Sequence, residues 1–477
     1  MSDTEKTGIL DRTLIGLRSA WRDVVQPGRG LEPTEFRPDL PESDAEKLRK
    51  HMQECLDGKG GEVSARARAA TLGQVYLYLN DTGRKRFLEI MVRDFCLDRE
   101  SLYSAARNIG EHDDLETSMR AETELRNILR PPHLKLLTQF NALPQGVKFL
   151  VDLRADLRTY MDGDPLLEGL DRDLKALLIS WFDIGFLDLK RITWNEPASL
   201  LEKLVDYEAV HQITSWEDLK NRLDSDRRVY AFFHPRMPME PLIFVQVALV
   251  SGISDNIHDL LDENAPNQDP RGADTAIFYS ITNTQRGLHG VSFGNFLIKR
   301  VVDHLSRDLP NLKTFATLSP VPGLRKFIGK LTSEQEQAIL SEYEIGEIQR
   351  LTEVEHLKDV IKNFDWDHDV KLAEVIRRPL INICARYLIL EQKDGHALDP
   401  VAHFHLNNGA RLERINWLAD VSKKGMQQSA GLMVNYLYKL SDIDKNHERY
   451  QASGKVVTSS SLRSLVKDQE SLVKAQN

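Results

Sequence analysis

Cysteine is scarce in this chain of 477 residues, and the three cysteines lie far apart, at Cys55, Cys96 and Cys384. No two of them have the short spacing that a zinc module needs, and their number is too small for a disulfide framework. The cysteine content therefore excludes a small disulfide-rich fold and gives no sign of a cysteine-based metal module.

An excess of positive charge is also missing. The 63 lysine and arginine residues are outnumbered by 72 aspartate and glutamate residues, which gives a net charge of −9. A nucleic-acid-binding domain normally carries a basic surface, so we expect no nucleic-acid partner. No apolar run approaches the roughly 18 residues that cross a bilayer, so we expect no membrane partner either.

Targeting signals are lacking at both ends of the sequence. The first residues, MSDTEKTGILDRT, have neither the basic nor the apolar segment of a secretory signal peptide. The last residues, SLVKAQN, do not form a peroxisomal address. These features lead us to expect a cytoplasmic protein.

Helical periodicity dominates the first part of the chain. In residues 8–25 apolar side chains recur at spacings of three and four, which marks one face of a helix. Residues 146–161 and 174–192 have the same character. The length suggests two or three domains. We therefore predict a helical domain over residues 1–190, used for packing or oligomer contacts, and a second domain over residues 191–477.

The second part of the chain changes to a pattern of strands. The runs RRVYAFFHP and PLIFVQVALV are rich in β-branched and aromatic residues and predict a hairpin. TAIFYSITNT predicts a third strand, and it is followed by a glycine-bearing loop, the amphipathic NFLIKRVVDHL and the strand LKTFATLS. This order predicts a βαβ unit with two parallel strands. Ser319 then lies at the carboxyl end of a strand, where open α/β sheets bind ligands.

The segment FATLSPVPGLRKF, residues 315–327, has two interpretations. Serine, proline and glycine are common in turns, so the segment fits an ordinary tight turn after a strand. Alternatively, Pro320 and Pro322 fix the hydroxyl of Ser319 where chemistry needs it. The position of Ser319 at the end of a parallel strand favours the second interpretation. Thr317 points to the same strand face, and we expect it to matter less than Ser319.

The loop QRGLHGVSFGN lies between a predicted strand and a predicted helix. The first N–H groups of a helix lack partners, so such a loop can bind an anion. Glycines for a tight turn explain the loop about as well, since it matches neither a P-loop nor G-x-G-x-x-G. In its βαβ context the loop resembles the pyrophosphate loop of GNAT acyltransferases, with degenerate positions at His289 and Ser292.

Two histidines lie in LDPVAHFHLNNGARLERINW, residues 398–417. Asp399 is a suitable N-cap, Pro400 fits the first helical position, and a glycine follows the helix. His403 and His405 are two residues apart and therefore point in different directions. A lone histidine is more often a packing residue than a catalyst. The position of His405 at the last turn of a helix that leads into the sheet favours a catalytic role.

An acidic segment, FDWDHD at residues 364–369, raises the alternative of a metal site. Asp365 and Asp367 precede a predicted helix, so N-capping and helix-dipole pairing explain them better. A metal would need a further group of ligands that the sequence does not offer. We expect no metal.

Four stretches together carry a resemblance to a known family. They are EPLIFVQVALV, IFYSITNTQRGLHGVSFGNFLIKRVV, FATLSPVPGLRKF and FHLNNGARLERINWLADVS. In this order they resemble the malonyl-CoA decarboxylase family from about Leu189 to Tyr438, with a looser helical likeness before that. The resemblance implies an α+β multidomain protein, with an N-terminal all-helical bundle followed by a GNAT-like α/β catalytic domain that has a mixed sheet.

The resemblance also implies roles for particular residues. The family's catalytic pair falls on Ser319 and His405, and positions that line its active site fall on Ser280 and Tyr438. The substrate-binding loop falls on Gly287, His289, Gly290, Val291, Ser292, Gly294 and Asn295. Some members carry a glutamate at Ser292, so a role for that carboxylate is in doubt in this chain.

The implied reaction converts malonyl-CoA to acetyl-CoA and carbon dioxide. The thioester carbonyl takes up the electrons, so we expect no cofactor. The alternatives are a GNAT-type acyltransferase, which would need a site for an acceptor amine, and a coenzyme A sensor without activity. We expect a homo-oligomer, with a homotetramer as one such assembly.

Overall fold

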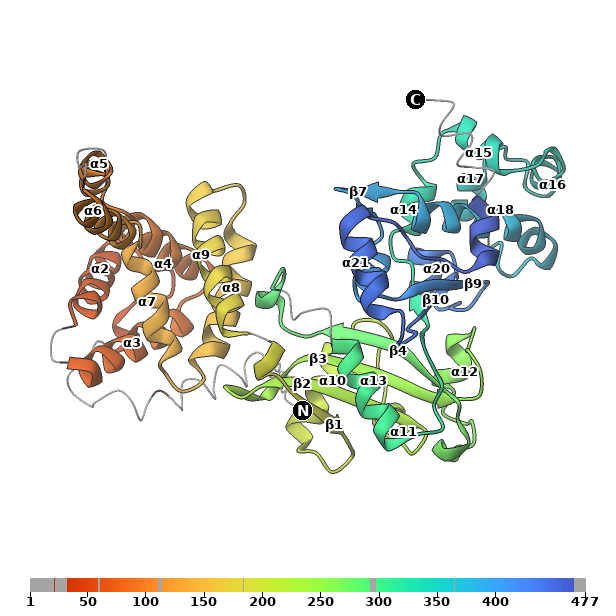
Figure 1. Ribbon diagram of the computed structural model, residues 1–477, viewed down its shortest axis with the longest axis horizontal. Helices are drawn as coiled ribbons and strands as arrows, with labels where there is room; N and C mark the ends of the chain where they lie inside the picture. The colour runs from red at the N-terminus through yellow and green to blue at the C-terminus, as the bar shows by residue number, and fades with distance from the viewer. Residues whose placement is uncertain are drawn as a thin grey trace, which may run out of the picture. The chain divides into compact units, whose positions relative to one another are not determined.

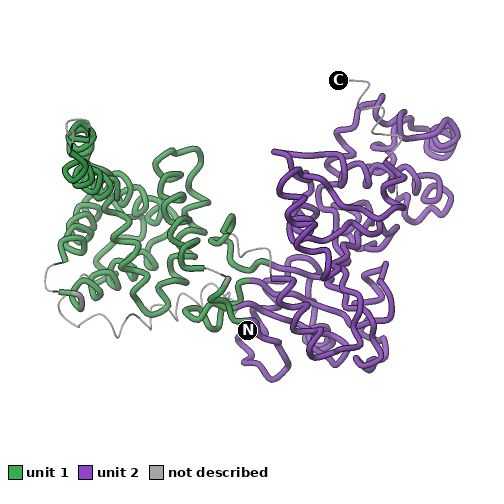
Figure 2. The backbone as a smooth tube through the Cα atoms, in the orientation of Figure 1, with its two compact units in different colours: residues 1–188, 233–242, 283–293 green, residues 189–232, 243–282, 294–477 purple. Residues whose placement is uncertain are grey.

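A computed structural model describes Trp21 and residues 32–58, 61–109, 114–182, 184–291, 297–363 and 365–466. The described chain divides into two compact units (Figure 2). The first contains residues 1–188 with the segments 233–242 and 283–293, and the second contains residues 189–232, 243–282 and 294–477. The boundary that we place at residue 190 stays a prediction, and the two added segments show that the first unit is not continuous in sequence.

The first unit is built mainly from helices (Figure 1). Carboxylate and amide side chains begin several of them, because an N-cap oxygen satisfies N–H groups that have no helical partner. Asn80, Asp98 and Asp164 act in this way. The helices are α2 (Glu42–Asp57), α3 (Gly61–Tyr78), α4 (Asp81–Asp94), α5 (Arg99–Asn108), α6 (Leu115–Ile128), α7 (Pro132–Asn141), α8 (Gly146–Tyr160) and α9 (Pro165–Trp181).

Two helical predictions in this region need comment. The helix predicted over residues 8–25 lies outside the described residues except for Trp21, which is buried with its ring 4.9 Å from that of Phe149. The helix predicted over residues 174–192 is wrong in its second half. Helix α9 ends at Trp181, and residues Asp188–Ile192 form strand β1. Gly185 lies in a short 3-10 helix, Ile184–Phe186, and β1 then forms the edge of the sheet.

The second unit contains most of a mixed sheet (Figure 1). Its order is β1-β2-β3-β4-β5-β10-β6, and β9 also pairs with β10. β4 and β5 are parallel, with α13 (Leu297–Asp308) between them in sequence, so the predicted βαβ unit is confirmed. The strands after β1 are β2 (Arg227–His234), β3 (Met237–Val250), β4 (Thr275–Asn283), β5 (Thr314–Thr317), β6 (Ser319–Pro320), β9 (Arg411–Asn416) and β10 (Met433–Leu437).

Helices and one small hairpin complete the second unit. The helices are α10 (Ala198–Tyr207), α11 (Trp216–Arg222), α12 (Ile257–Leu261), α14 (Leu324–Ile328), α15 (Ser333–Ile339), α16 (Glu342–Thr352), α17 (Leu357–Asn363), α18 (Val370–Ile389), α19 (Pro400–Asn407), α20 (Lys423–Ser429) and α21 (Ile443–Ser453). The hairpin pairs β7 (Gln392–Lys393) with β8 (His396–Ala397). A helical part followed by a mixed sheet confirms the predicted fold class. No helix among the described residues is long and apolar enough to span a bilayer.

Alternation along β5 separates a packing face from a polar face. Ala316 and Leu318 belong to a buried apolar cluster that also includes Ile277 of β4. Successive side chains of a strand point to opposite faces, so Thr317 and Ser319 face the other side. The apolar cluster fixes the strand, and the polar face is left for the candidate site.

Candidate active site

The Ser-Pro-Val-Pro-Gly turn starts inside the sheet. Ser319 and Pro320 form β6, where Ser319 pairs with Val434 of β10. A residue before proline is restricted to an extended conformation, which suits this position. The N–H of Val321 donates to Ser429 Oγ at 3.0 Å and holds the turn from the other side. The backbone is therefore held both at Ser319 and two residues later at Val321, and this fixes the position from which the Ser319 side chain extends.

Gly323 ends this turn because of a close approach. A Cβ atom at this position would lie 2.0 Å from the hydroxyl oxygen of Tyr387 on α18, although the backbone of Gly323 has an ordinary right-handed conformation. Absence of a side chain, and not a left-handed conformation, is therefore what the turn requires of Gly323. α18 and the turn pack together at this point.

His405 is positioned by the short helix α19. Asp399 is its N-cap and accepts hydrogen bonds from the N–H groups of Val401 and Ala402, and Gly409 follows the helix with φ +78°, as predicted. Burial raises the pKa of Asp399 to about 6. Because α19 is only two turns long, its cap fixes the direction of the whole helix and hence the position of His405.

The structure brings Ser319, His405 and Tyr438 into one hydrogen-bonded chain. Ser319 Oγ lies 3.0 Å from His405 Nε2, and Tyr438 Oη lies 2.8 Å from His405 Nδ1. Ser319 donates its hydrogen to Thr317 Oγ1 at 2.9 Å. With that hydrogen committed, the Ser319–His405 contact needs a proton on Nε2, and Nδ1 then accepts from the phenol of Tyr438. This tautomer aims a histidine proton at Ser319.

Burial sets the charge state of this chain. His405 and Tyr438 are 3% and 2% exposed. Burial lowers the pKa of His405 to about 3, because a charged imidazolium would lose its hydration. Burial likewise raises the pKa of Tyr438 well above its usual value. The free site therefore holds a neutral imidazole and a neutral phenol at neutral pH.

Two residues of the site were not identified as important from the sequence. Thr317 accepts the hydroxyl of Ser319, and Tyr436 stacks on the imidazole of His405 with ring centroids 4.6 Å apart. The signal for both was strand alternation, since Thr317 shares a face with Ser319 and Tyr436 shares one with Tyr438. Thr317 is in direct contact with Ser319 and is not a bystander.

His403 points elsewhere, as predicted from its spacing. Its Nδ1 atom lies 3.0 Å from the hydroxyl oxygen of Tyr450 on α21, and its ring contacts that of His396. These contacts join α19 to α21 and to the β7–β8 hairpin. His403 therefore has a packing environment that is separate from the hydrogen-bonded chain at His405.

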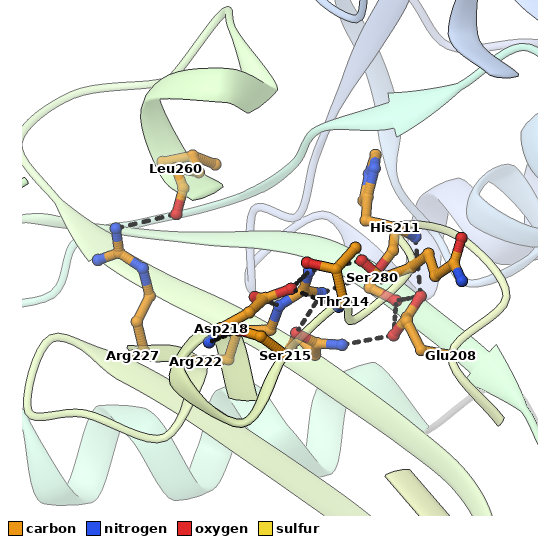
Figure 3. Close-up of polar contacts among 11 residues, drawn as sticks. Glu208, His211, Thr214, Ser215, Asp218, Arg222, Arg227, Leu260 and Ser280 are labelled. Atoms are coloured by element: carbon orange, nitrogen blue, oxygen red, sulfur yellow. Dashed lines mark hydrogen bonds and ion pairs between the residues drawn. The ribbon is translucent and has the colours of Figure 1, made fainter. Parts of the chain in front are cut away.

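Ser280 lies in a different hydrogen-bonded group (Figure 3). Its Oγ atom lies 2.9 Å from each carboxylate oxygen of Glu208, which also accepts from the N–H groups of Val210 and His211. Phe278 of β4 pairs with Thr317 of β5, and this pairing ends two residues before Ser280 and Ser319. Glu208 was not identified from the sequence. The predicted role of Ser280 in lining the site stays a prediction.

The described half of the glycine loop packs against helix α8, within the first unit. A Cβ atom on Gly287 would lie 1.7 Å from the carbonyl oxygen of Val151, so this glycine permits close packing. Val291 is buried, whereas His289 and Gly290 are exposed. Gly290 has φ +74°, a conformation that favours glycine. The predicted loop residues Ser292, Gly294 and Asn295 lie outside the described residues.

Backbone N–H groups of this half-loop already have acceptors. Those of Leu288, His289 and Val291 donate to the carbonyl oxygens of Gln285, Arg286 and Leu288. These three amides are therefore not free for an anion unless their hydrogen bonds break. Within the described part of the loop, the exposed stretch at His289 and Gly290 is the better placed for a ligand.

No group of three or more histidine, cysteine, aspartate or glutamate side chains among the described residues is arranged to hold a metal ion. The acidic segment at Asp365 and Asp367 is close in sequence to Asp369, which is the N-cap of α18. The N-cap is thus the third aspartate of that segment and neither of the two that we considered.

Comparisons with known proteins cover nearly the whole described chain. A family model described as the malonyl-CoA decarboxylase C-terminal domain matches residues 185–476, and one described as the N-terminal domain of the same family matches residues 95–182. The mitochondrial malonyl-CoA decarboxylase of Mus musculus is 40% identical over an alignment of 494 positions, which covers 96% of this chain and 97% of that protein. The corresponding protein of Anser anser anser is 39% identical over 422 residues, which cover 84% of each chain.

Solved structures agree with the sequence comparisons. The malonyl-CoA decarboxylase of Rhodopseudomonas palustris has a TM-score of 0.80 and 38% identity, covering 88% of this chain and 99% of that one. The malonyl-CoA decarboxylase of Agrobacterium vitis has a TM-score of 0.80 and 40% identity with the same coverage. On sequence and structure together, the chain belongs to the malonyl-CoA decarboxylase family.

Proposed function

We propose that this chain converts malonyl-CoA to acetyl-CoA and carbon dioxide, with Ser319 and His405 as its catalytic pair. The observation that supports the pair is the 3.0 Å contact between Ser319 Oγ and His405 Nε2 in a buried part of the sheet face. Family membership supports the reaction, and the geometry supports the assignment of these two residues.

The reaction needs a place for two electrons and a source of one proton. When the carboxylate bond of the malonyl group lies perpendicular to the thioester plane, its electrons pass to the thioester carbonyl as carbon dioxide leaves. The resulting enolate is then protonated on carbon to give the acetyl group. The protein must supply hydrogen-bond donors to the enolate oxygen and a proton donor near the carbon.

The hydroxyl of Ser319 and the imidazole of His405 can serve these needs. Ser319 donates to the substrate carboxylate or to the enolate oxygen, once the substrate replaces Thr317 as its acceptor. The negative charge of the malonyl group favours the protonated form of the buried imidazole, so substrate binding raises the pKa of His405 from about 3. The added proton goes to Nδ1, where the hydroxyl of Tyr438 turns from donor to acceptor, and the Nε2 proton then passes to the new methyl group and leaves a neutral imidazole.

Tyr438 keeps the imidazole in position. Its phenol contacts His405 Nδ1 at 2.8 Å, and burial keeps that phenol protonated. In the free protein the phenol donates to Nδ1, so the neutral imidazole carries its proton on Nε2, which faces Ser319. We assign Tyr438 to positioning as well as to lining the site.

The coenzyme A portion of the substrate is assigned to the glycine loop, with Gly287, His289, Gly290 and Val291 in its described half. Ser292, Gly294 and Asn295 complete this assignment from the sequence. Exposure of His289 and the left-handed conformation of Gly290 support a ligand contact at this point. Gly287 and Val291 contribute by holding the loop rather than by touching the ligand. Ser280 is assigned to the substrate side of β4, two residues beyond the pairing of Phe278 with Thr317.

The assay that tests this function uses purified protein and malonyl-CoA, with no acceptor and no added cofactor. Release of carbon dioxide and formation of acetyl-CoA in equal amounts is the expected result. An acyltransferase would leave malonyl-CoA intact until an acceptor amine is supplied, and a sensor would bind it without any product. Either of those results would refute decarboxylation.

We also keep two predictions from the sequence, a homo-oligomer and a cytoplasmic location. The vertebrate relatives are labelled mitochondrial, so the location needs a direct test. Light scattering on the purified protein measures the assembly, and imaging or fractionation of tagged protein in its native cell measures the location.

A further inference from the structure

The glycine loop is held by a buried arginine of the first unit, which is called the helical unit below. Arg154 on α8 is 0% exposed, and its Nη1 atom donates to the carbonyl oxygen of Gly287 at 2.6 Å and to that of His289 at 3.0 Å. Two carbonyl groups of the loop are therefore turned toward α8. Since these carbonyls flank Leu288, their fixed direction also fixes the conformation of the exposed residues that follow.

The charge of Arg154 is balanced inside the same unit. Its Nε and Nη2 atoms donate to the two carboxylate oxygens of Asp171 on α9, at 2.8 and 3.2 Å. A bidentate pair of this kind fixes the plane of the guanidinium group. Burying an arginine costs free energy unless its charge is paired and its N–H groups are hydrogen-bonded. The carboxylate and the two carbonyl groups meet this requirement for Arg154. Its four hydrogen bonds join α8, α9 and the loop.

A second cation, Lys175 on α9, lies beside the same loop. Lys175 follows Asp171 by four residues, so both side chains lie on one face of α9. The ammonium nitrogen of Lys175 lies 3.1 Å from the point that a Cβ atom on Gly290 would occupy. Lys175 is half-buried and has no ion pair with another described residue. A cation with no ion-pair partner among the described residues therefore lies beside the exposed, left-handed Gly290 of the loop.

We propose that the helical unit carries a phosphate subsite for coenzyme A, in which Lys175 contacts a phosphate group and Arg154 is a positioning residue for the loop. This inference rests on the proposed function, because it takes the glycine loop as the coenzyme A loop. It adds a ligand-binding role to a unit for which the sequence indicated packing or oligomer contacts. The ligand class is the phosphorylated nucleotide portion of coenzyme A and not the malonyl group.

Lys175 is tested with Lys175→Ala, and Lys85→Ala serves as the matched control. Lys85 is an exposed lysine on α4 of the same unit, so both variants lose one positive charge. Calorimetry with coenzyme A itself is expected to show affinity weakened by about tenfold in Lys175→Ala, the loss of one charge-assisted contact, and unchanged affinity in the control. Equal affinity in Lys175→Ala and the wild-type protein would overturn the subsite, and so would equal weakening in both variants.

Substrate comparison separates phosphate binding from other effects. Malonyl-pantetheine carries the reacting thioester but none of the phosphate groups. Lys175→Ala is expected to raise KM for malonyl-CoA while leaving kcat, and KM for malonyl-pantetheine, unchanged. A rise for both substrates contradicts the proposal. If the wild-type protein binds coenzyme A through Lys175 but releases no carbon dioxide, the proposed function fails and the subsite stands.

Arg154 is tested with Arg154→Lys, which keeps the charge but cannot bind Asp171 and both carbonyls at once. We expect KM for malonyl-CoA to rise several-fold, with kcat at saturation and KM for malonyl-pantetheine changed less than about twofold. The thermal midpoint is measured alongside. Lower stability with no change in KM would show that Arg154 is structural only and would overturn its positioning role.

Discussion

The Nε2 atom of His405 lies 3.0 Å from the Oγ atom of Ser319, a residue 86 positions earlier in the chain. One partner stands on the short helix α19, and the other stands at the start of a proline-restricted turn. Both are buried, so the contact is shielded from water. Low local polarity strengthens a hydrogen bond of this kind and makes its loss costly.

Replacement of the Ser319 hydroxyl tests its role directly. Ser319→Ala is expected to lower kcat by about 10²–10³, the range for loss of one preorganised donor. Binding of acetyl-CoA, which lacks the reacting carboxylate, should change little. Thr317→Val removes the oxygen that accepts from Ser319 in the free site, and we expect it to cost less than Ser319→Ala. Normal turnover by Ser319→Ala would contradict the assignment.

The pair should behave as one unit. The double variant Ser319→Ala with His405→Asn is expected to be no slower than the slower of the two single variants, because groups that act together are strongly non-additive. Steady-state kcat values of the three variants give the comparison. Multiplied losses would show two independent groups instead of a pair.

The two histidines of α19 should differ sharply. His405→Asn is expected to reduce kcat by about 10²–10⁴, the usual contribution of general acid–base catalysis. His403→Asn removes a contact with Tyr450 and should lower stability with little effect on kcat. Turnover and thermal midpoint are measured for both, and similar losses of turnover in folded variants would refute the assignment to His405.

The buried imidazole should make the protein sensitive to acid. The pKa of His405 is about 3 in the folded chain, against 6.5 as its ordinary value. Between these values the unfolded chain binds more protons, so the free energy of unfolding falls as the pH drops below 6.5. From about pH 7 to about pH 5 the loss from this group is on the order of 2 kcal/mol.

Denaturant unfolding of the wild-type protein and of His405→Gln across this pH range measures the contribution of His405 to the free energy of unfolding. The variant should lose less stability on acidification than the wild-type protein, because its amide does not titrate. Parallel pH profiles for the two proteins would show that His405 is not held neutral by burial.

The close approach at the end of the Ser-Pro-Val-Pro-Gly turn gives a paired test. Gly323→Ala places a methyl group 2.0 Å from the hydroxyl oxygen of Tyr387 and should destabilise the fold by about 1–3 kcal/mol, as overpacking does. Tyr387→Phe removes that oxygen, so the double variant should recover part of the loss. Chemical denaturation of the four proteins gives the coupling, and simple additivity would show that this contact is not the cause.

Local features of this protein were readable from the sequence because they depend on neighbouring residues. Proline after Ser319 restricts its backbone, Asp399 before Pro400 caps a helix, and glycine at 409 adopts a left-handed conformation to end it. Apolar spacing distinguished the helical part from the sheet part, and the order of strand, helix and strand predicted a parallel pair. Apolar spacing gave the wrong structure for residues 188–192, which we predicted as helix and which form the edge strand β1.

Only the tertiary structure decided which of these local features meet. Sheet register places Tyr438 next to β5 and gives His405 its second hydroxyl partner, and packing places Glu208 against Ser280. Arg154 reaches the glycine loop across 133 positions of sequence. The preferences that sequence reveals act over a few residues, whereas hydrogen bonds between distant side chains depend on the packing of whole elements. The neutral state of His405 follows from that packing as well, because burial and not residue type sets its pKa.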